Sequence, residues 1–179
     1  MKLWKNKLED FFKWVKGTEL VELDDIDVSE DPVRPELTLG WRITKGRKIF
    51  GLKYDNEIEG VICIAFTNDV PTSLKELDIM SELADIKNEK KIAIAYTVWS
   101  RKRGAGREII TKLREWAIKN NYSRLVTLSP LTPMATHFHI KNGAKQVHIN
   151  EETQNFERLV TLSPLTPMAT HFHIRNGAK

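Results

Sequence analysis

The stretch of sequence that decides the fold is residues 96–108, YTVWSRKRGAGRE. An apolar, strand-like segment runs into a loop that contains Gly104 and Gly106, and this loop opens a helix. Glycine lets the backbone turn tightly and lets an anion come close to the main chain. The free N–H groups of the first helical turn then point at that anion. The junction therefore predicts an anion site, and a phosphate is the expected ligand.

Basic side chains surround the same junction. Residues 99–123 carry seven Lys or Arg and two Asp or Glu, a local net charge of +5. The G-x-x-x-x-G-K-[ST] and G-x-G-x-x-G loops of nucleotide-binding folds are both missing from the sequence. Three interpretations stay open on these local features. We favour a pyrophosphate site over a contact to a nucleic-acid backbone and over a solvated helix start with incidental arginines.

The segments around this junction alternate between strand and helix patterns. Strands are expected at 48–54, 59–67, 91–99, 122–128, 144–150 and 155–162. Helices are expected at 73–83, 107–120 and 134–141, the last closed by Asn142-Gly143. The order predicts an α/β fold of the α+β kind, with a mixed central sheet of about six to seven strands flanked by helices.

The N-terminal segment, residues 1–18, has the pattern of an amphipathic helix. Its apolar residues repeat on one face, and five lysines occupy other positions. Such a helix can lie on a membrane or pack on its own domain, and we favour packing on the domain. The run that follows, 19–31, holds seven Asp or Glu and is expected to be a solvated strand edge and loop.

A 22-residue block occurs twice near the C-terminus. Residues 124–145 and 158–179 differ only at Lys141 and Arg175. Two near-identical copies indicate a segment duplication, because a solenoid needs about three or more units. We expect a domain at 19–162 and a C-terminal tail at 163–179. One molecule has one place for this segment, so the second copy is expected to form a disordered tail, a helix docked on the surface, or an arm exchanged between molecules. Exchange would produce a homodimer.

Length and composition bound the function classes. The 179 residues carry a formal net charge of +4 and are 41% hydrophobic, which fits one domain with a substantial core. Most of that charge belongs to the duplicated block, so nucleic acid is not an expected partner. The single cysteine, Cys63, excludes an intramolecular disulfide and is expected to be buried in a strand. No apolar run approaches the ~20 residues of a membrane span, and no secretory signal pattern is seen, so a cytoplasmic protein is expected.

These motifs resemble the GNAT superfamily of acetyl-CoA-dependent N-acetyltransferases. The GNAT loop reads (Gln/Arg)-x-x-Gly-x-(Gly/Ala) at the end of the fourth strand, and residues 101–106, RKRGAG, match every specified position. Further along, the family has a pattern like Phe-Tyr-x-x-x-Gly-Phe, and residues 138–144, FHIKNGA, stand in that place. The resemblance covers most of the chain. It implies that 19–162 is an acyltransferase domain whose fourth and fifth strands splay apart.

The resemblance also implies a cofactor and a reaction. An acetyl group would pass directly from acetyl-CoA to an amine of a protein or small molecule. Backbone amides of the loop would hold the coenzyme A pyrophosphate, and the preceding strand would pair with the pantetheine arm. The coenzyme-binding residues implied are Thr97, Val98, Trp99, Arg101, Lys102, Arg103, Gly104, Ala105, Gly106, Arg107 and Thr132.

The catalytic candidates are His139 and Tyr96. His139 stands where the family often has a tyrosine that protonates the leaving thiolate, and an imidazole can donate a proton near pH 7. A histidine on the helix surface is the alternative. A backbone N–H in 96–99 is a candidate donor to the tetrahedral intermediate. The strand at 92–99 holds no carboxylate that could act as a base. His137 and His139 point to different sides of a helix, so no metal site is expected.

The main rival is a non-catalytic binding protein on the same scaffold. It would use the basic loop on nucleic acid or on a protein, and its binding would depend steeply on salt and not on coenzyme A. For the enzyme, the acidic run at 19–31 suggests a surface that attracts a cationic amine.

Overall fold

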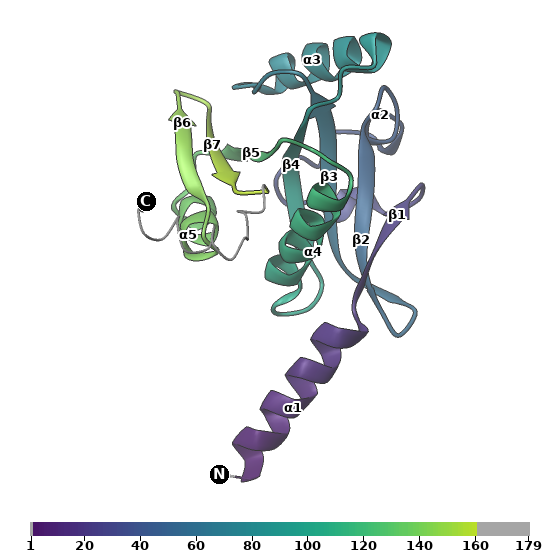
Figure 1. The fold of residues 1–179 in the computed structure, drawn as a ribbon, viewed down its shortest axis with the longest axis vertical. Helices are drawn as coiled ribbons and strands as arrows, with labels where there is room; N and C mark the ends of the chain where they lie inside the picture. Colours follow the sequence, from purple (N-terminus) through teal and green to yellow (C-terminus); the bar gives the residue numbers. More distant parts are fainter. Residues whose placement is uncertain (1, 161–179) are drawn as a thin grey trace, which may run out of the picture.

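The computed structural model describes residues 2–160 of the chain (Figure 1). The helices are α1 (Lys2–Gly17), α2 (Leu39–Arg42), α3 (Leu74–Lys87), α4 (Ala105–Lys119) and α5 (Pro133–Lys141), with a 3-10 turn at Val28–Glu30. The strands are β1 (Glu19–Leu23), β2 (Lys48–Tyr54), β3 (Glu57–Thr67), β4 (Ile92–Ser100), β5 (Arg124–Pro130), β6 (Lys145–Ile149) and β7 (Thr153–Arg158). Each strand and helix expected from the sequence forms, with shifts at its ends. The last strand, expected at 155–162, ends at Arg158, and residues 161 and 162 lie outside the described residues.

The strands form one mixed sheet, as the sequence pattern predicts. Its order is β1-β2-β3-β4-β5-β7-β6, and seven strands take part. Only the central pair β4–β5 is parallel; the other neighbours are antiparallel. The tight β2–β3 turn uses Asp55 and Asn56, whose φ angles of 48° and 67° suit a two-residue hairpin. The α+β fold class with a mixed sheet is therefore confirmed.

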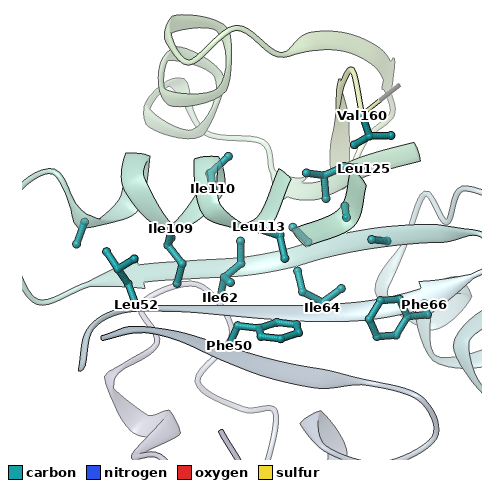
Figure 2. Close-up of a cluster of buried hydrophobic side chains, with 14 of the residues drawn as sticks. Phe50, Leu52, Ile62, Ile64, Phe66, Ile109, Ile110, Leu113, Leu125 and Val160 are labelled. Atoms are coloured by element: carbon teal, nitrogen blue, oxygen red, sulfur yellow. The ribbon is translucent and has the colours of Figure 1, made fainter. Parts of the chain in front are cut away.

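Two hydrophobic cores lie on opposite faces of this sheet, because successive strand residues point to opposite sides. The first core lies against α4, whose residues Ile109, Ile110 and Leu113 recur at helical spacing (Figure 2). The second core includes Leu77 of α3 and Cys63 of β3. Burial raises the pKa of the Cys63 thiol to about 11, which makes it the inert core residue that the sequence predicts.

The N-terminal helix forms, but the prediction that it packs on its own domain is wrong for most of its length. Figure 1 shows α1 extending away from the sheet. Near its end, Trp14 is buried and Val15 is half-buried. The apolar side chains before Trp14 remain exposed. None of the helices within residues 2–160 is long and apolar enough to cross a bilayer.

Two short elements were not expected from the sequence. The 3-10 turn and α2 are too short to show a hydrophobic period, yet they carry Asp31, next to the turn, and Arg42 into the interior. Asp31 is therefore an exception to the solvated loop expected at 19–31. The proposed tail, 163–179, lies outside the described residues, so the consequence of the duplication stays a prediction.

Candidate functional site

A cavity of about 510 Å³ opens beside the carboxyl ends of β4 and β5. Alternate residues of β5, Leu125, Thr127 and Ser129, line it from the sheet, while Val126 and Leu128 belong to the core on the other face. α4 and α5 supply further walls, including Gly106 and His139. The volume lies within the range of small-molecule sites. The sheet's geometry thus places a few polar groups of β5 in a mostly apolar cavity.

The cavity exists because β4 and β5 separate. Their parallel ladder ends at Ala95 and Thr127, although β4 continues to Ser100 and β5 to Pro130. A register shift between Cys63 and Ile64 marks an irregularity in the β3–β4 pairing at the same level. The splay expected from the sequence resemblance is therefore present, and the edge of β4 that faces the cavity beyond Ala95 is not paired to β5.

Arg34 bridges the first open position of this splay. Its Nε donates to the carbonyl oxygen of Tyr96 at 3.0 Å, and its Nη2 donates to that of Leu128 at 3.2 Å. These two carbonyls belong to the two separating strands, so the guanidinium takes the place of the next ladder bond. Burial lowers the pKa of Arg34, but arginine stays charged in proteins. A fixed cation therefore stands at the apex of the splay.

The first turn of α4 begins at the cavity. Gly104 has a φ of 90°, a conformation that glycine adopts at little cost, and it provides no side-chain cap to the helix. The Ala105 amide donates to the carbonyl oxygen of Lys102 at 3.1 Å, so the amides of Gly106 and Arg107 are the ones left to a ligand or solvent. Gly106 lines the cavity itself, where a ligand can approach the backbone closely. A helix start of this kind suits an anion, and the anion site expected from the loop sequence stays a prediction.

The positive charge around this loop is smaller than its sequence suggests. Arg101 forms a two-point ion pair with Glu30, at 2.8 and 2.7 Å. The Nζ of Lys102 lies 3.5 Å from Glu59 and 4.7 Å from the centre of the Trp14 ring. Arg103 and Arg107 are also exposed beside the loop. The local charge of +5 counted along the sequence is therefore partly neutralised by acids from other elements.

His139 lies inside the cavity wall and is 5% exposed. Its Nε2 is 2.9 Å from the Oγ of Ser129, and its ring stacks on Phe156 at 4.8 Å between centroids. The surface-histidine alternative is thus wrong. Burial, and after it the charge of Arg158, lowers the pKa of His139 to about 4, so the ring is neutral at pH 7.

Arg158 of β7 also lines the cavity and is 7% exposed. Its Nη1 donates to the carbonyl oxygen of Asn142, but its buried Nε and Nη2 find no hydrogen-bond partner within residues 2–160. The charged neighbour that acts on its pKa is Arg114, a second cation, while burial has the larger lowering effect. Buried donors without partners are rare in folded proteins, so this guanidinium offers two strong contacts to an anionic ligand.

The side chains of Tyr96 and Thr97 face away from the polar end of the cavity. The Tyr96 ring packs edge-on against Trp41, within the core on the other face of the sheet, and burial raises its pKa well above the ordinary value. The Thr97 hydroxyl donates to Asp31 at 2.8 Å, and Asp31 pairs with Arg42 at the same distance. Only the backbone of this part of β4 is therefore free to serve a ligand.

The residues proposed from sequence divide into two groups. The cavity is lined by Tyr96, Thr97, Val98, Trp99, Gly106, Thr132 and His139. The others do not line it: Arg101, Lys102, Arg103 and Gly104 lie in the loop before α4, and Ala105 and Arg107 lie in the first turn of α4.

Sequence reasoning missed Ser129, Arg158 and Arg34. Two features of the sequence could have indicated the first two. Ser129 stands just before Pro130, at the end of the strand that precedes the His139 helix, and Arg158 is a lone arginine in the last strand.

Comparisons with known proteins agree with this architecture. No protein-family profile and no curated protein sequence matches the chain. Among solved structures, a Bacillus subtilis acetyltransferase in complex with CoA matches with a TM-score of 0.57 at 9% identity, over 79% of this chain and 98% of that one. A GNAT family acetyltransferase from Elizabethkingia anophelis with acetyl-CoA bound matches with a TM-score of 0.51 at 11% identity, over 80% and 98%.

A third match is a larger protein. The malonyl-CoA decarboxylase from Agrobacterium vitis matches with a TM-score of 0.52 at 18% identity, over 76% of this chain. The chain covers 39% of the length of that decarboxylase. At these identities the likeness concerns the fold. The splayed β4–β5 pair, the uncapped first turn of α4 and these matches together give the chain the GNAT fold.

Proposed function

We propose that this chain binds a short acyl-CoA in the cavity and decarboxylates a malonyl-type acyl group. One observation carries the proposal: the buried, uncharged Ser129–His139 pair shares an apolar cavity with Arg158, whose Nε and Nη2 are unused within residues 2–160. An acetyl group has no charge to offer this arginine. A malonyl group has a carboxylate, the natural partner of a guanidinium with two parallel donors.

The coenzyme part of the substrate would follow the open edge of β4. Backbone groups of 97–99 would pair with the pantetheine arm, and the amides of Gly106 and Arg107 in the first turn of α4 would meet the pyrophosphate. The apolar lining by Val98, Ile110 and Phe138 suits the pantetheine chain. Arg103 and Arg107 lie at the exposed loop, where they would add charge attraction without a fixed contact.

The reaction balances without a second substrate. The bond between the carboxylate carbon and the α-carbon breaks, CO₂ leaves, and the electron pair moves into the thioester carbonyl. A proton from water then takes the place of the carboxylate on the α-carbon. Negative charge grows on the thioester oxygen during this step, so a hydrogen-bond donor near that oxygen speeds it.

Ser129 and His139 would provide that donor. The Nδ1 of His139 is buried without a partner among the described residues, and a bare ring nitrogen is tolerated there better than an N–H group. The proton then sits on Nε2 and is donated to the Ser129 Oγ. The serine hydroxyl donates to the Thr127 Oγ1 at 3.2 Å in this structure, and it would turn from Thr127 to the thioester oxygen when the substrate binds. The lowered pKa keeps the imidazole neutral, so the pair donates without carrying a formal charge.

Acetyl transfer from acetyl-CoA to an amine is the second candidate. The open β4 edge favours it, because two acetyltransferases of the same fold were crystallised with CoA or acetyl-CoA. Two features count against an amine acceptor. The described strand β4 has no carboxylate base, and Glu30, a carboxylate that lines the cavity, is held in an ion pair by Arg101. The Arg34 cation at the splay would also repel an ammonium group. The fold alone supports either reaction, since one of the matched proteins is a malonyl-CoA decarboxylase.

The two reactions differ in their products, and one assay separates them. The chain is incubated with malonyl-CoA alone and, separately, with acetyl-CoA with and without an amine, and released CO₂ and free thiol are measured in each mixture. Decarboxylation gives CO₂ and acetyl-CoA with no free thiol. Acetyl transfer gives free thiol from acetyl-CoA only when an amine is added. Thiol release that depends on an amine, with no CO₂ from malonyl-CoA, would overturn the decarboxylase proposal.

Variants then connect the activity to the site. Ser129→Ala should lower the rate of CO₂ release by about 100-fold, because it removes the hydrogen-bond donor to the thioester oxygen. Ser123→Ala, an exposed serine that precedes β5, is the matched control and should keep the full rate. A Ser129→Ala protein with an unchanged rate would place the chemistry elsewhere.

A further inference from the structure

Helix α1 has an apolar face that does not pack on its own domain. Five large apolar side chains on this helix stay exposed: Leu3 78%, Trp4 75%, Leu8 46%, Phe11 48% and Phe12 54%. Spacings of three and four residues place most of them along one side of the helix. Lys7, four residues from both Leu3 and Phe11, interrupts this apolar stripe. The remaining apolar surface, with three aromatic rings in it, marks an interaction surface.

Within residues 2–160, the contacts that hold the helix on the domain lie at its C-terminal end. Trp14 donates from Nε1 to Glu59 at 2.6 Å, and Lys102 lies over its ring. Gly17 packs so tightly on Tyr54 that a Cβ there would lie 2.7 Å from the ring. Everything before Trp14 extends away from the sheet (Figure 1). The domain therefore presents the stripe to its surroundings on a helix about 24 Å long.

The charges on the helix identify the occupant. α1 carries five lysines against Glu9 and Asp10, a net charge of +3. A second copy of the helix would bring two such charges together, which opposes self-pairing. Anionic lipid headgroups would meet the lysines while the acyl chains took the aromatic and leucine side chains. Lysine-rich polar faces opposite Trp, Phe and Leu are the usual composition of helices that lie in a membrane interface.

We propose that α1 docks the protein on an anionic membrane surface, with the stripe buried at the level of the headgroups. The helix lies along the bilayer and does not cross it. The anchored end at Trp14 then fixes the GNAT domain beside the membrane. This inference concerns a surface separate from the cavity and does not depend on which acyl-CoA reaction the chain performs.

Vesicle flotation of the full chain tests the proposal. The protein is mixed with vesicles of phosphatidylcholine alone, or with about one third phosphatidylglycerol. Binding is expected to the anionic vesicles and to weaken when the salt concentration is raised, because salt screens the lysines. The double variant Leu8→Asp/Phe12→Asp should bind at least about 100-fold more weakly, since it removes two inserted apolar side chains.

A matched control excludes a general effect of surface charge. Leu83 and Ile86 of α3 are 47% and 74% exposed, so Leu83→Asp/Ile86→Asp makes the same change on another helix and should bind within about twofold of the unchanged chain. Circular dichroism confirms that both variants are folded. Absence of binding to anionic vesicles, or equal binding by the α1 variant, would overturn the proposal. So would a dimer in solution that ignores vesicles and dissociates in the α1 variant.

Discussion

Two buried arginines lie on opposite faces of the same sheet, and their surroundings differ. Arg42, on the side of α3, donates to Asp31 and to the carbonyl oxygens of Leu37 and Arg34. Arg158, on the side of α4 and α5, uses Nη1 and leaves Nε and Nη2 unpaired within residues 2–160. The first arginine completes a polar network inside the protein, whereas the second has donors to spare. The difference indicates that Arg42 stabilises the fold and that Arg158 binds a ligand.

The largest effect is expected where the satisfied network is broken. In Asp31→Ala the charge of Arg42 stays buried, with 0% exposure, and loses its ion-pair partner. The free energy of unfolding should fall by about 3–5 kcal/mol, measured by urea denaturation. Glu82→Ala breaks the exposed pair with Lys45 and should cost no more than about 1 kcal/mol. Equal losses in the two variants would remove the distinction between a buried and a surface pair.

The free energy of unfolding should depend on pH through His139, which lies on the same side of the sheet as Arg158 and is held neutral there. Its pKa is about 4 in the folded protein and about 6.5 in the unfolded chain. Between these values the unfolded chain binds the proton first, so stability is full above pH 6.5 and falls as the pH drops toward 4. The loss should approach about 3 kcal/mol. Urea denaturation at pH 7 and pH 4 measures it.

The variant His139→Gln should lose this part of the pH dependence. His148→Asn, at an exposed position in β6, is the control and should keep the profile of the unchanged chain. If His139→Gln and the unchanged chain respond to acid alike, the imidazole is not held neutral by its surroundings.

The variant Arg158→Met tests whether the unpaired Nε and Nη2 of Arg158 bind the substrate carboxylate. The rate of CO₂ release from malonyl-CoA at low substrate should fall about 100-fold, equivalent to about 2.7 kcal/mol, because the carboxylate loses its partner. Stability should hold or rise, since an incompletely paired buried charge is replaced by an apolar side chain of similar length. A loss of stability as large as that in Asp31→Ala would show that Arg158 is structural like Arg42.

The sequence predicts the parts of this site that depend on neighbouring residues. The loop at 101–106 and the strand before it follow from local periodicity and from two glycines, and the structure has the uncapped helix start expected there. His139 follows from a short motif. The orientation of Tyr96 does not, because the irregular register beside Cys63 decides which way its ring points.

The rest of the site depends on contacts between distant residues. Arg34 donates to the carbonyl oxygens of residues that lie 62 and 94 positions later in the sequence. A pattern within one segment cannot predict such a contact. Arg158 approaches the cavity because β7 pairs with β5 in a register that places it opposite Leu125. The hydrophobic spacing of residues 2–17 predicts the apolar face of α1, but it does not predict which surface that face contacts.

The smallest effect is expected at Tyr96, the catalytic candidate on the Arg42 side of the sheet. Its hydroxyl is buried without a partner among the described residues, and its ring lies in the core across the sheet from Ser129. Tyr96→Phe removes an unsatisfied polar group, so the free energy of unfolding should stay the same or rise by up to about 1 kcal/mol. The rate with malonyl-CoA should stay within about twofold, because the backbone of β4 is unchanged. A large fall in rate with unchanged stability would show that the Tyr96 hydroxyl takes part in the reaction and that residues on both faces of the sheet belong to the site.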